Sequence, residues 1–185
     1  MWNIPNLLTS FRIFLIPVFL VVFYLPVENA HFLAALIFVL AAITDALDGW
    51  VARKFDQMTK FGAFFDPVAD KIMVAAALIV VVEDYGSLWI TVPGLIIISR
   101  ELIVSALREW MAEIGKRSAV AVSSLGKLKT IAQMVALTGL LWQGSKGIEV
   151  IATMALYVSA VLTIWSMYIY LDNAWKDLTD ESNAK

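Results

Sequence analysis

The chain alternates long apolar stretches with short polar ones. Six apolar segments of about 17–24 residues are each long enough, at 1.5 Å per residue, to cross about 30 Å of hydrocarbon as a helix. The segments between them are rich in Gly, Ser, Asn and acidic residues, which is typical of turns. The pattern predicts transmembrane helices at roughly Leu7–Leu25, Phe32–Arg53, Gly62–Val82, Leu88–Arg108, Leu125–Trp142 and Val150–Leu171. A polar tail, from Trp175 to Lys185, is expected to be frayed.

Composition strengthens this interpretation. The chain has 185 residues, of which 61% are hydrophobic and 16% charged, and its mean hydropathy is +0.79. A soluble domain of this size could not bury so much apolar surface. We therefore expect a single domain over residues 1–185, an all-α polytopic membrane protein. The net charge of −2 gives no basic surface for nucleic acid, and the absence of cysteine excludes disulfides and thiolate chemistry.

The distribution of Lys and Arg predicts the orientation. With six spans, the two termini, the loop between spans two and three and the loop between spans four and five share one side. All 14 Lys and Arg residues except Lys146 lie on or toward that side. Cytoplasmic loops carry such an excess of positive charge. Both termini are therefore expected in the cytoplasm, with the protein in the inner (plasma) membrane.

Four aspartates interrupt the apolar pattern. Asp45 and Asp48 close the second span, and Asp66 and Asp70 open the third. Spacings of three and four residues place each pair on one helix face. Because a short connection makes the two helices antiparallel neighbours, all four carboxylates can converge at the cytoplasmic membrane surface.

Converging carboxylates repel one another and are costly to desolvate. Either some of them are protonated, or divalent cations bind between them; any one alone would usually be a solvated helix end. Carboxylate oxygens suit hard ions such as Mg²⁺ or Mn²⁺, and four carboxylates balance the charge of two such ions. Paired ions are typical of phosphoryl transfer. Gly49 and Gly62, on the same helix faces, would let a ligand approach closely.

These residues carry a family resemblance. The pattern Asp45-x2-Asp48-Gly49-x2-Ala52-Arg53-x8-Gly62-x3-Asp66-x3-Asp70 resembles the signature of the CDP-alcohol phosphotransferases, with no departure at any position. Further similar motifs lie at 3–9, 99–110 and 126–130. Together they resemble bacterial members that use CDP-diacylglycerol and sn-glycerol 3-phosphate.

The resemblance implies roles for individual residues. Asp45, Asp48, Asp66 and Asp70 would hold two metal ions, and Asp70 would also be the catalytic general base. The CDP-binding residues would be Pro5, Asn6, Gly49, Arg53, Thr59 and Gly62. The reaction implied yields phosphatidylglycerophosphate and CMP by direct transfer, and family members are typically homodimers with six transmembrane helices.

A phosphorylated acceptor requires cations. Arg100 and Arg108 lie two turns apart on one side of the fourth span, and guanidinium groups bind phosphate in a bidentate manner. Lys127 and Lys129 open the fifth span, but they face one pocket only if Gly126 leaves Lys127 in a loop. Arg12 and Glu101, also charged, either pair with each other or with backbone groups, or border the site.

Two alternatives stay open. A transporter could place acids along an ion path, although these acids lie at one face of the membrane and no inverted repeat is apparent. A sister enzyme could use the same lipid donor with another acceptor, such as inositol phosphate, serine or a second phosphatidylglycerol. The cationic set favours a phosphorylated acceptor, but only the resemblance identifies glycerol 3-phosphate.

Overall fold

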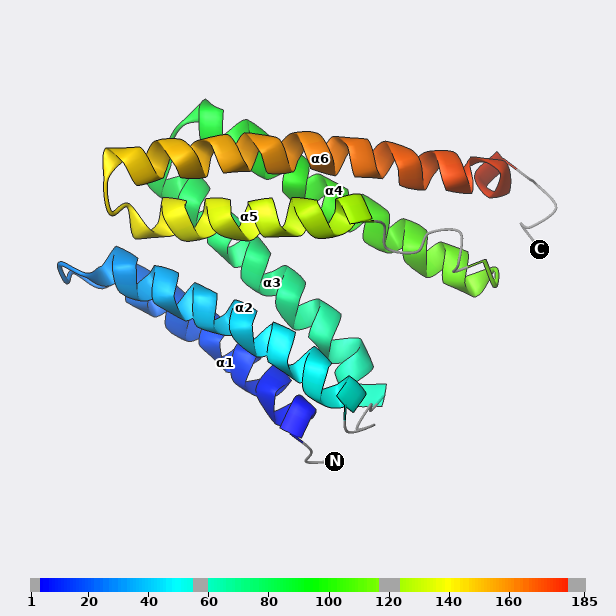
Figure 1. Cartoon of the computed structure of the whole chain (residues 1–185), viewed down its shortest axis with the longest axis horizontal. Helices are drawn as coiled ribbons and strands as arrows, with labels where there is room; N and C mark the ends of the chain where they lie inside the picture. Colours follow the sequence, from blue (N-terminus) through cyan, green and yellow to red (C-terminus); the bar gives the residue numbers. More distant parts are fainter. Residues whose placement is uncertain (1–3, 55–59, 117–123, 180–185) are drawn as a thin grey trace. The chain divides into compact units, whose positions relative to one another are not determined.

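A computed structural model of the chain describes residues 4–54, 60–116 and 124–179 (Figure 1). These residues are helical, with short connections and no strand. The six helices within the described ranges are α1 (Ile4–Phe23), α2 (Ala30–Lys54), α3 (Lys60–Tyr85), α4 (Leu88–Glu113), α5 (Ser124–Trp142) and α6 (Lys146–Thr179). Five of them cover a whole predicted apolar segment, and α1 covers all of Leu7–Leu25 but its last two residues, which confirms the all-α class. A helix satisfies its own backbone hydrogen bonds, as an apolar environment demands.

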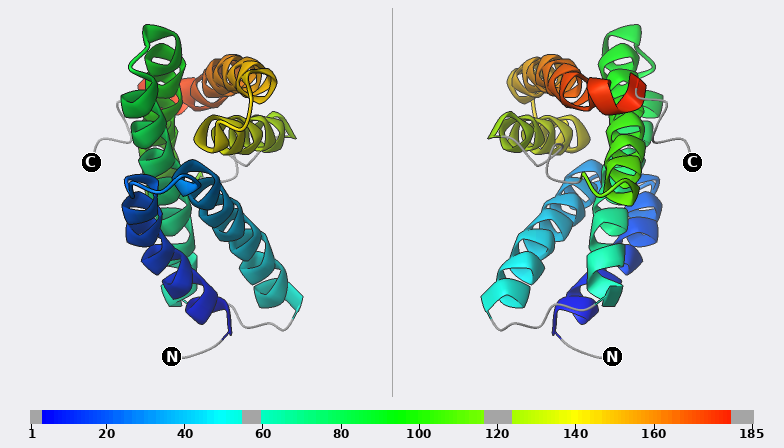
Figure 2. Two further views of the ribbon diagram at one scale, coloured as in Figure 1. Left: turned by 90° about the vertical axis from the view of Figure 1, so that its left-hand side faces the viewer. Right: turned by 90° about the vertical axis from the view of Figure 1, so that its right-hand side faces the viewer.

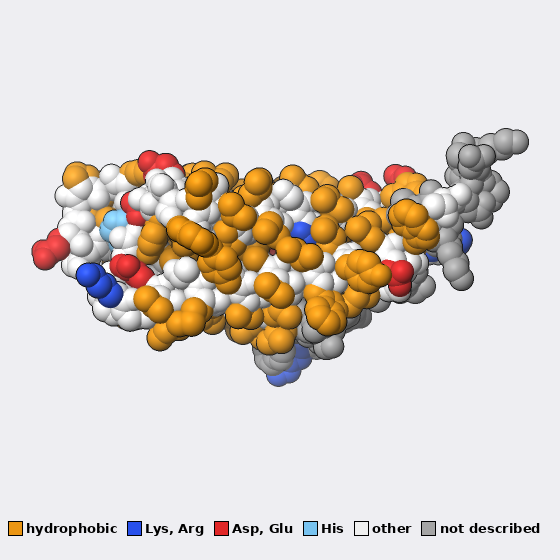
Figure 3. Space-filling model, turned by 90° about the horizontal axis from the view of Figure 1, so that it is seen from above, with side chains coloured by type: hydrophobic (Ala, Val, Ile, Leu, Met, Phe, Trp, Pro, Cys, Tyr) orange, Lys and Arg blue, Asp and Glu red, His pale blue; other side chains and the backbone are white. Residues whose placement is uncertain are grey.

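Two helices of the described chain are long and apolar enough to cross a bilayer by length and composition. They are Leu88–Glu113 and Lys146–Trp175. Three shorter apolar stretches lie at Leu7–Phe23, Ala30–Asp45 and Leu128–Trp142. Large hydrophobic side chains such as Phe64, Ile79 and Trp165 are more than half exposed. Hydrophobic side chains also predominate among the coloured side chains on the face seen in Figure 3, as in a protein whose surroundings are lipid.

The chain divides into two compact units. One comprises Met1–Gly86 with Leu137–Ala152, and the other comprises Ser87–Ala136 with Thr153–Lys185. Both α5 and α6 therefore contribute residues to each unit.

In the first unit α1 packs against both α2 and α3. The helices α1 and α2 form an antiparallel hairpin, joined by a turn at 24–29 (Figures 1 and 2). Buried residues repeat at helical spacing, for example Phe19 and Phe23 on α1 and Ala69, Met73 and Ala77 on α3. The small alanines let the backbones approach closely.

Polar contacts link residues at or just after the C-terminal ends of α1, α3 and α5, beyond the last residue of the predicted third span. Tyr24 Oη donates to Glu83 Oε2 at 3.0 Å, and the Gln143 side-chain amide donates to Asp84. Burial raises the pKa of Tyr85 to about 12, and the nearby carboxylates of Glu149 and Asp84 contribute to the shift. Tyr85 therefore stays a protonated donor across the physiological range.

In the second unit α4 and α6 share a hydrophobic cluster. Its buried members are Val104, Leu107 and Met111 on α4 and Tyr170 and Ala174 on α6. Because Ala174 is fully buried in this cluster, the helix continues past the last apolar span. The expectation of a frayed tail from Trp175 is therefore wrong as far as Thr179, where α6 ends.

Gly139 marks a close approach of α5 and α6. A Cβ added at Gly139 would lie 2.6 Å from the Cβ of Ala152, closer than real contacts allow. Neither atom belongs to a flexible side chain, so one helix would have to move. Small residues at such positions are typical of helix pairs packed in membranes.

We expect Gly139→Ala to destabilise the protein by about 1–3 kcal/mol, as overpacking in a filled core does. The measurement is thermal unfolding of the purified protein in detergent. Gly147→Ala is the matched control, because the nearest atom to its added Cβ is 3.9 Å away. Equal unfolding midpoints for the two variants would contradict the close packing described.

Candidate functional site

Two predicted metal ligands from different helices contact the same face of α1. Thr9 Oγ1 donates a short hydrogen bond to Asp66 Oδ1 on α3. Arg12 Nη1 donates to Asp45 Oδ1 on α2 at 2.7 Å, forming an ion pair. Residues three apart on a helix have Cβ atoms about 5–6 Å apart. The carboxylates of Asp45 and Asp66 therefore meet neighbouring positions on α1.

The other two predicted ligands follow on the same helices. Asp70 lies one turn beyond Asp66 on α3 and is partly exposed; Asp48 lies within α2, but its side chain is outside the described set. Among the side chains that are described, no three His, Asp or Glu residues form a group that could hold a metal ion. Convergence of all four aspartates therefore stays a prediction.

The donor chemistry of these residues fits a hard divalent cation. Each of the two α1 contacts occupies Oδ1, whereas an ionised carboxylate has two oxygens and about four lone-pair sites. The side chain of Asp45 is 44% exposed even with its Arg12 partner in place. Carboxylate oxygens of this kind are the preferred ligands of Mg²⁺. Asp45 and Asp66 thus retain the capacity to bind a cation.

The predicted CDP-binding residues fall at the same helix ends. Pro5 and Asn6 lie in the first turn of α1, Gly49 and Arg53 near the end of α2, and the buried Gly62 near the start of α3. Figure 2 shows these three helix ends at one end of the unit. Side chains of the first four, and the whole of Thr59, lie outside the described residues. Their contacts with a nucleotide stay a prediction.

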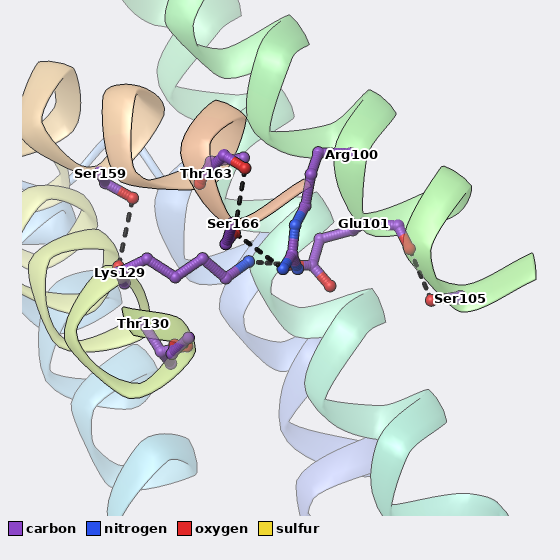
Figure 4. A network of polar contacts seen from close by, with 9 residues as sticks. Arg100, Glu101, Ser105, Lys129, Thr130, Ser159, Thr163 and Ser166 are labelled. Atoms are coloured by element: carbon purple, nitrogen blue, oxygen red, sulfur yellow. Dashed lines mark hydrogen bonds and ion pairs between the residues drawn. The ribbon is translucent and has the colours of Figure 1, made fainter. Parts of the chain in front are cut away.

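A second polar group lies in the other unit, among α4, α5 and α6 (Figure 4). The carboxylate of Glu101 accepts from two cations through the same oxygen, Oε1: Arg100 Nη1 at 3.0 Å and Lys129 Nζ in a shorter contact. Arg100 and Lys129 are 6% and 4% exposed, whereas the Glu101 side chain is 27% exposed. Arg12 and Glu101 therefore pair with different partners, and not with each other.

Hydroxyl and aromatic groups of α6 complete this network. Arg100 Nη2 donates to Ser166 Oγ at 3.0 Å, and the guanidinium lies over the Tyr170 ring, 5.6 Å from its centroid. Ser159 Oγ donates to the backbone carbonyl of Lys129 at 3.2 Å. Because Arg100 and Lys129 together carry two positive charges and Glu101 carries one negative charge, these three side chains have a net charge of +1. Such an excess favours an anion.

The remaining predicted acceptor residues are placed differently. Arg108 lies two turns beyond Arg100 on α4 and is partly exposed. The helix α5 begins at Ser124, so Gly126 and Lys127 are helical. Lys127 and Lys129 then project about 200° apart. The loop position that would let both face one pocket is therefore wrong, and the side chain of Lys127 lies outside the described set.

Sequence reasoning missed the partners of these charges. Thr9, which contacts Asp66, is fully buried, and Ser166, which contacts Arg100, is 1% exposed. A hydroxyl group in an otherwise apolar segment is the signal that could have identified them, because a buried polar group is costly unless it is hydrogen-bonded. The sequence alone does not reveal which charge each hydroxyl contacts.

Comparison with known proteins identifies the class to which this helical fold, with its carboxylate-bearing helix ends, belongs. Residues 2–165 match the model of the CDP-alcohol phosphatidyltransferase family, and the chain belongs to that family.

Similar relatives are named CDP-diacylglycerol–glycerol-3-phosphate 3-phosphatidyltransferase. The protein from Pectobacterium atrosepticum is 60% identical over 179 residues, covering 97% of this chain and 98% of its own. Those from Haemophilus influenzae and Shigella flexneri are each 57% identical, over 179 and 180 residues. They cover 97% of this chain, and 97% and 99% of their own lengths.

The Glu101 network generates a stability prediction. Glu101→Gln removes the charge of the carboxylate that Arg100 and Lys129 both contact, and loss of one partner is strongly destabilising for a buried pair. Because Glu101 is partly exposed, we expect a loss of about 2–3 kcal/mol, near the low end of the range for such pairs. Thermal unfolding in detergent measures it.

The double variant Glu101→Gln with Lys129→Met is the control, since it also removes one of the two cations that contact this carboxylate. It should recover part of the lost stability. A double variant no more stable than Glu101→Gln alone would show that the shared carboxylate does not compensate Lys129.

Proposed function

We propose that the protein transfers the phosphatidyl group of CDP-diacylglycerol to sn-glycerol 3-phosphate, releasing CMP and phosphatidylglycerophosphate. Membership of the family and relatives of 57–60% identity over nearly the whole chain support this reaction. The structural observation that supports it most directly is the joint contact of α1 with Asp45 and Asp66. That contact places one carboxylate from each signature helix beside the same turn.

Asp45, Asp48, Asp66 and Asp70 are the proposed ligands of two Mg²⁺ ions, and Mn²⁺ fits the same donors. When bound, such ions neutralise the pyrophosphate of the donor and stabilise the departing CMP. Pro5, Asn6, Gly49, Arg53, Thr59 and Gly62 are the proposed contacts of the CDP moiety. Glycine at 49 and 62 leaves room for the nucleotide beside the helix backbones.

Asp70 is the proposed general base. Its carboxylate takes the proton from the 1-hydroxyl of the acceptor, and that oxygen then attacks the β-phosphorus of CDP-diacylglycerol. The bond from the β-phosphorus to the bridging oxygen breaks, and CMP leaves with the electron pair. A positioned base of this kind contributes about 10²–10⁴-fold to a rate.

Arg100 and Lys129 are proposed to bind the acceptor phosphate, together with Arg108. The net positive charge shared by Arg100, Glu101 and Lys129 supports this role. Guanidinium and ammonium groups form charge-assisted hydrogen bonds with phosphate oxygens. Since Lys127 is helical, Lys129 is the stronger candidate of the two lysines.

The proposed setting is the inner membrane, with six spans, both termini in the cytoplasm and the site at the cytoplasmic surface. A lipid donor can then keep its acyl chains in the bilayer while its nucleotide reaches water. Homodimerisation is also proposed, because members of the family are typically homodimers.

A sister reaction with another acceptor is the second candidate. The cationic network favours a phosphorylated acceptor over serine, but inositol phosphate carries the same group. The identity of the acceptor rests on the relatives' names.

The deciding experiment measures CMP release from CDP-diacylglycerol by the purified protein, with a panel of acceptors and with or without Mg²⁺. We expect release that requires both Mg²⁺ and glycerol 3-phosphate. Asp70→Asn should lower kcat by at least about 100-fold. Asp84→Asn, on the same helix but at its other end, should retain activity. Release of no CMP under any condition would favour a transporter and reject the proposal.

Arg108→Ala tests the acceptor set. Loss of a charge-assisted contact to phosphate is equivalent to about 1.5–3 kcal/mol, so we expect the KM for glycerol 3-phosphate to rise at least about tenfold. The KM for CDP-diacylglycerol should change little. Lys146→Ala is the control, because it removes a cation that is predicted to lie on the other side of the membrane. An unchanged acceptor KM in Arg108→Ala would reject the assignment.

A further inference from the structure

Thr9 and Arg12 on α1 have no role in the reaction proposed above. Thr9 is fully buried and Arg12 is 1% exposed, although both stand in a helix whose other residues are almost all apolar. Burying a hydroxyl or a guanidinium in such a helix is costly unless it meets a partner. The contacts of Thr9 and Arg12 therefore compensate the cost of burying these two side chains.

Their contacts have a common pattern. Thr9 Oγ1 reaches Oδ1 of Asp66, and Arg12 Nη1 reaches Oδ1 of Asp45. Both donors lie on one face of α1, and both acceptors are carboxylates of the family signature, one from each helix that carries it. A single turn of α1 thus fixes two acidic side chains that come from separate helices.

In each contact the donor binds Oδ1 and does not bind the second carboxylate oxygen, Oδ2. A hydrogen bond to one oxygen restricts rotation of the carboxylate and aims the other oxygen in a fixed direction. Carboxylates that ligate metals are typically held in this way by an outer group, and loss of that group commonly weakens metal binding 10–100-fold.

We propose that Thr9 and Arg12 are positioning residues of the divalent-metal site: Thr9 orients Asp66, and Arg12 orients Asp45. This inference rests on the proposed function, because it takes the two aspartates to be metal ligands. It makes α1 an outer support that is shared by both ligand-bearing helices. Neither Thr9 nor Arg12 touches the metal in this arrangement.

A purely structural role would give a different result. Buried ion pairs contribute little net stability, and apolar residues of similar size often replace them without loss. If Thr9 and Arg12 only packed α1 against its neighbours, changing their polar atoms would alter unfolding and leave metal affinity unaffected. Direct metal binding, measured without substrate, separates the two roles.

The experiment measures Mn²⁺ binding to the purified full-length protein in detergent, by electron paramagnetic resonance of free Mn²⁺. Thr9→Val is the main variant, because it keeps the shape of the side chain and removes only the hydroxyl. We expect its Mn²⁺ affinity to fall about 10-fold or more. Thr9→Ser, which restores the hydroxyl, should bind within about threefold of the parent protein, a difference well below 1.4 kcal/mol.

Thr44→Val is the matched control. Thr44 precedes Asp45 on α2, but its hydroxyl donates to the backbone carbonyl of Ala41 at 2.7 Å and not to a carboxylate. This variant should retain the parent's Mn²⁺ affinity. An equal loss of affinity in Thr44→Val and Thr9→Val would overturn the proposal, because the effect would then not depend on the carboxylate contact.

Arg12→Lys is an independent test of the proposal, and it replaces Thr9→Val if that variant does not fold. It keeps the positive charge and loses the planar guanidinium geometry, so we expect weaker Mn²⁺ binding by about 10-fold. Unfolding midpoints in metal-free buffer confirm that each variant is folded. Parent-like Mn²⁺ affinity in folded Arg12→Lys or Thr9→Val overturns the corresponding assignment.

Asp66→Asn and Asp45→Asn distinguish the two levels of the argument. If these variants lose Mn²⁺ binding while Thr9→Val and Arg12→Lys keep it, the metal site stands and the positioning role fails. If Asp66→Asn and Asp45→Asn themselves bind Mn²⁺ as the parent does, the metal ligands of the proposed function fail as well.

Discussion

Every buried charge in an apolar helix needs a partner, and this requirement organises both polar regions of the protein. In the first unit Arg12 meets Asp45 and Thr9 meets Asp66; in the second, Glu101 meets Arg100 and Lys129. Lipid offers no water to hydrogen-bond such groups, so they turn toward protein. The pairs fix how α1 faces its neighbours and how α4 faces α5 and α6. The chemistry proposed for this protein uses residues from both arrangements.

Much of the fold could be predicted from the sequence. All six apolar segments are helices, because an uninterrupted apolar stretch leaves the backbone no other way to satisfy its hydrogen bonds. The end of α6 could not be predicted from polarity. Ala174 and Tyr170 are buried against Met111 of α4, and this tertiary packing extends the helix through residues that look like a solvated tail.

The sequence proposes the residues of the candidate site, but it does not predict their contacts. Spacing placed the four aspartates on two helix faces, and the family match supports the signature. No periodicity could pair Thr9 with Asp66, 57 positions apart, because that contact depends on how α1 lies against α3. The start of α5 at Ser124 lies within one residue of the predicted Leu125, so the helix that separates Lys127 from Lys129 agrees with the apolar pattern.

The length of α6 has a consequence for what holds its far end. Its 34 residues extend about 51 Å, whereas a hydrocarbon layer is about 30 Å thick. With the proposed spans ending at Arg108 and Leu171, the last turns of α4 and α6 would lie in the headgroup region and the water beyond. Apolar side chains gain nothing from meeting each other in lipid, but they do in water. The cluster around Met111 and Ala174 would then act as a small aqueous core, which urea and cold weaken more than they weaken contacts within the bilayer.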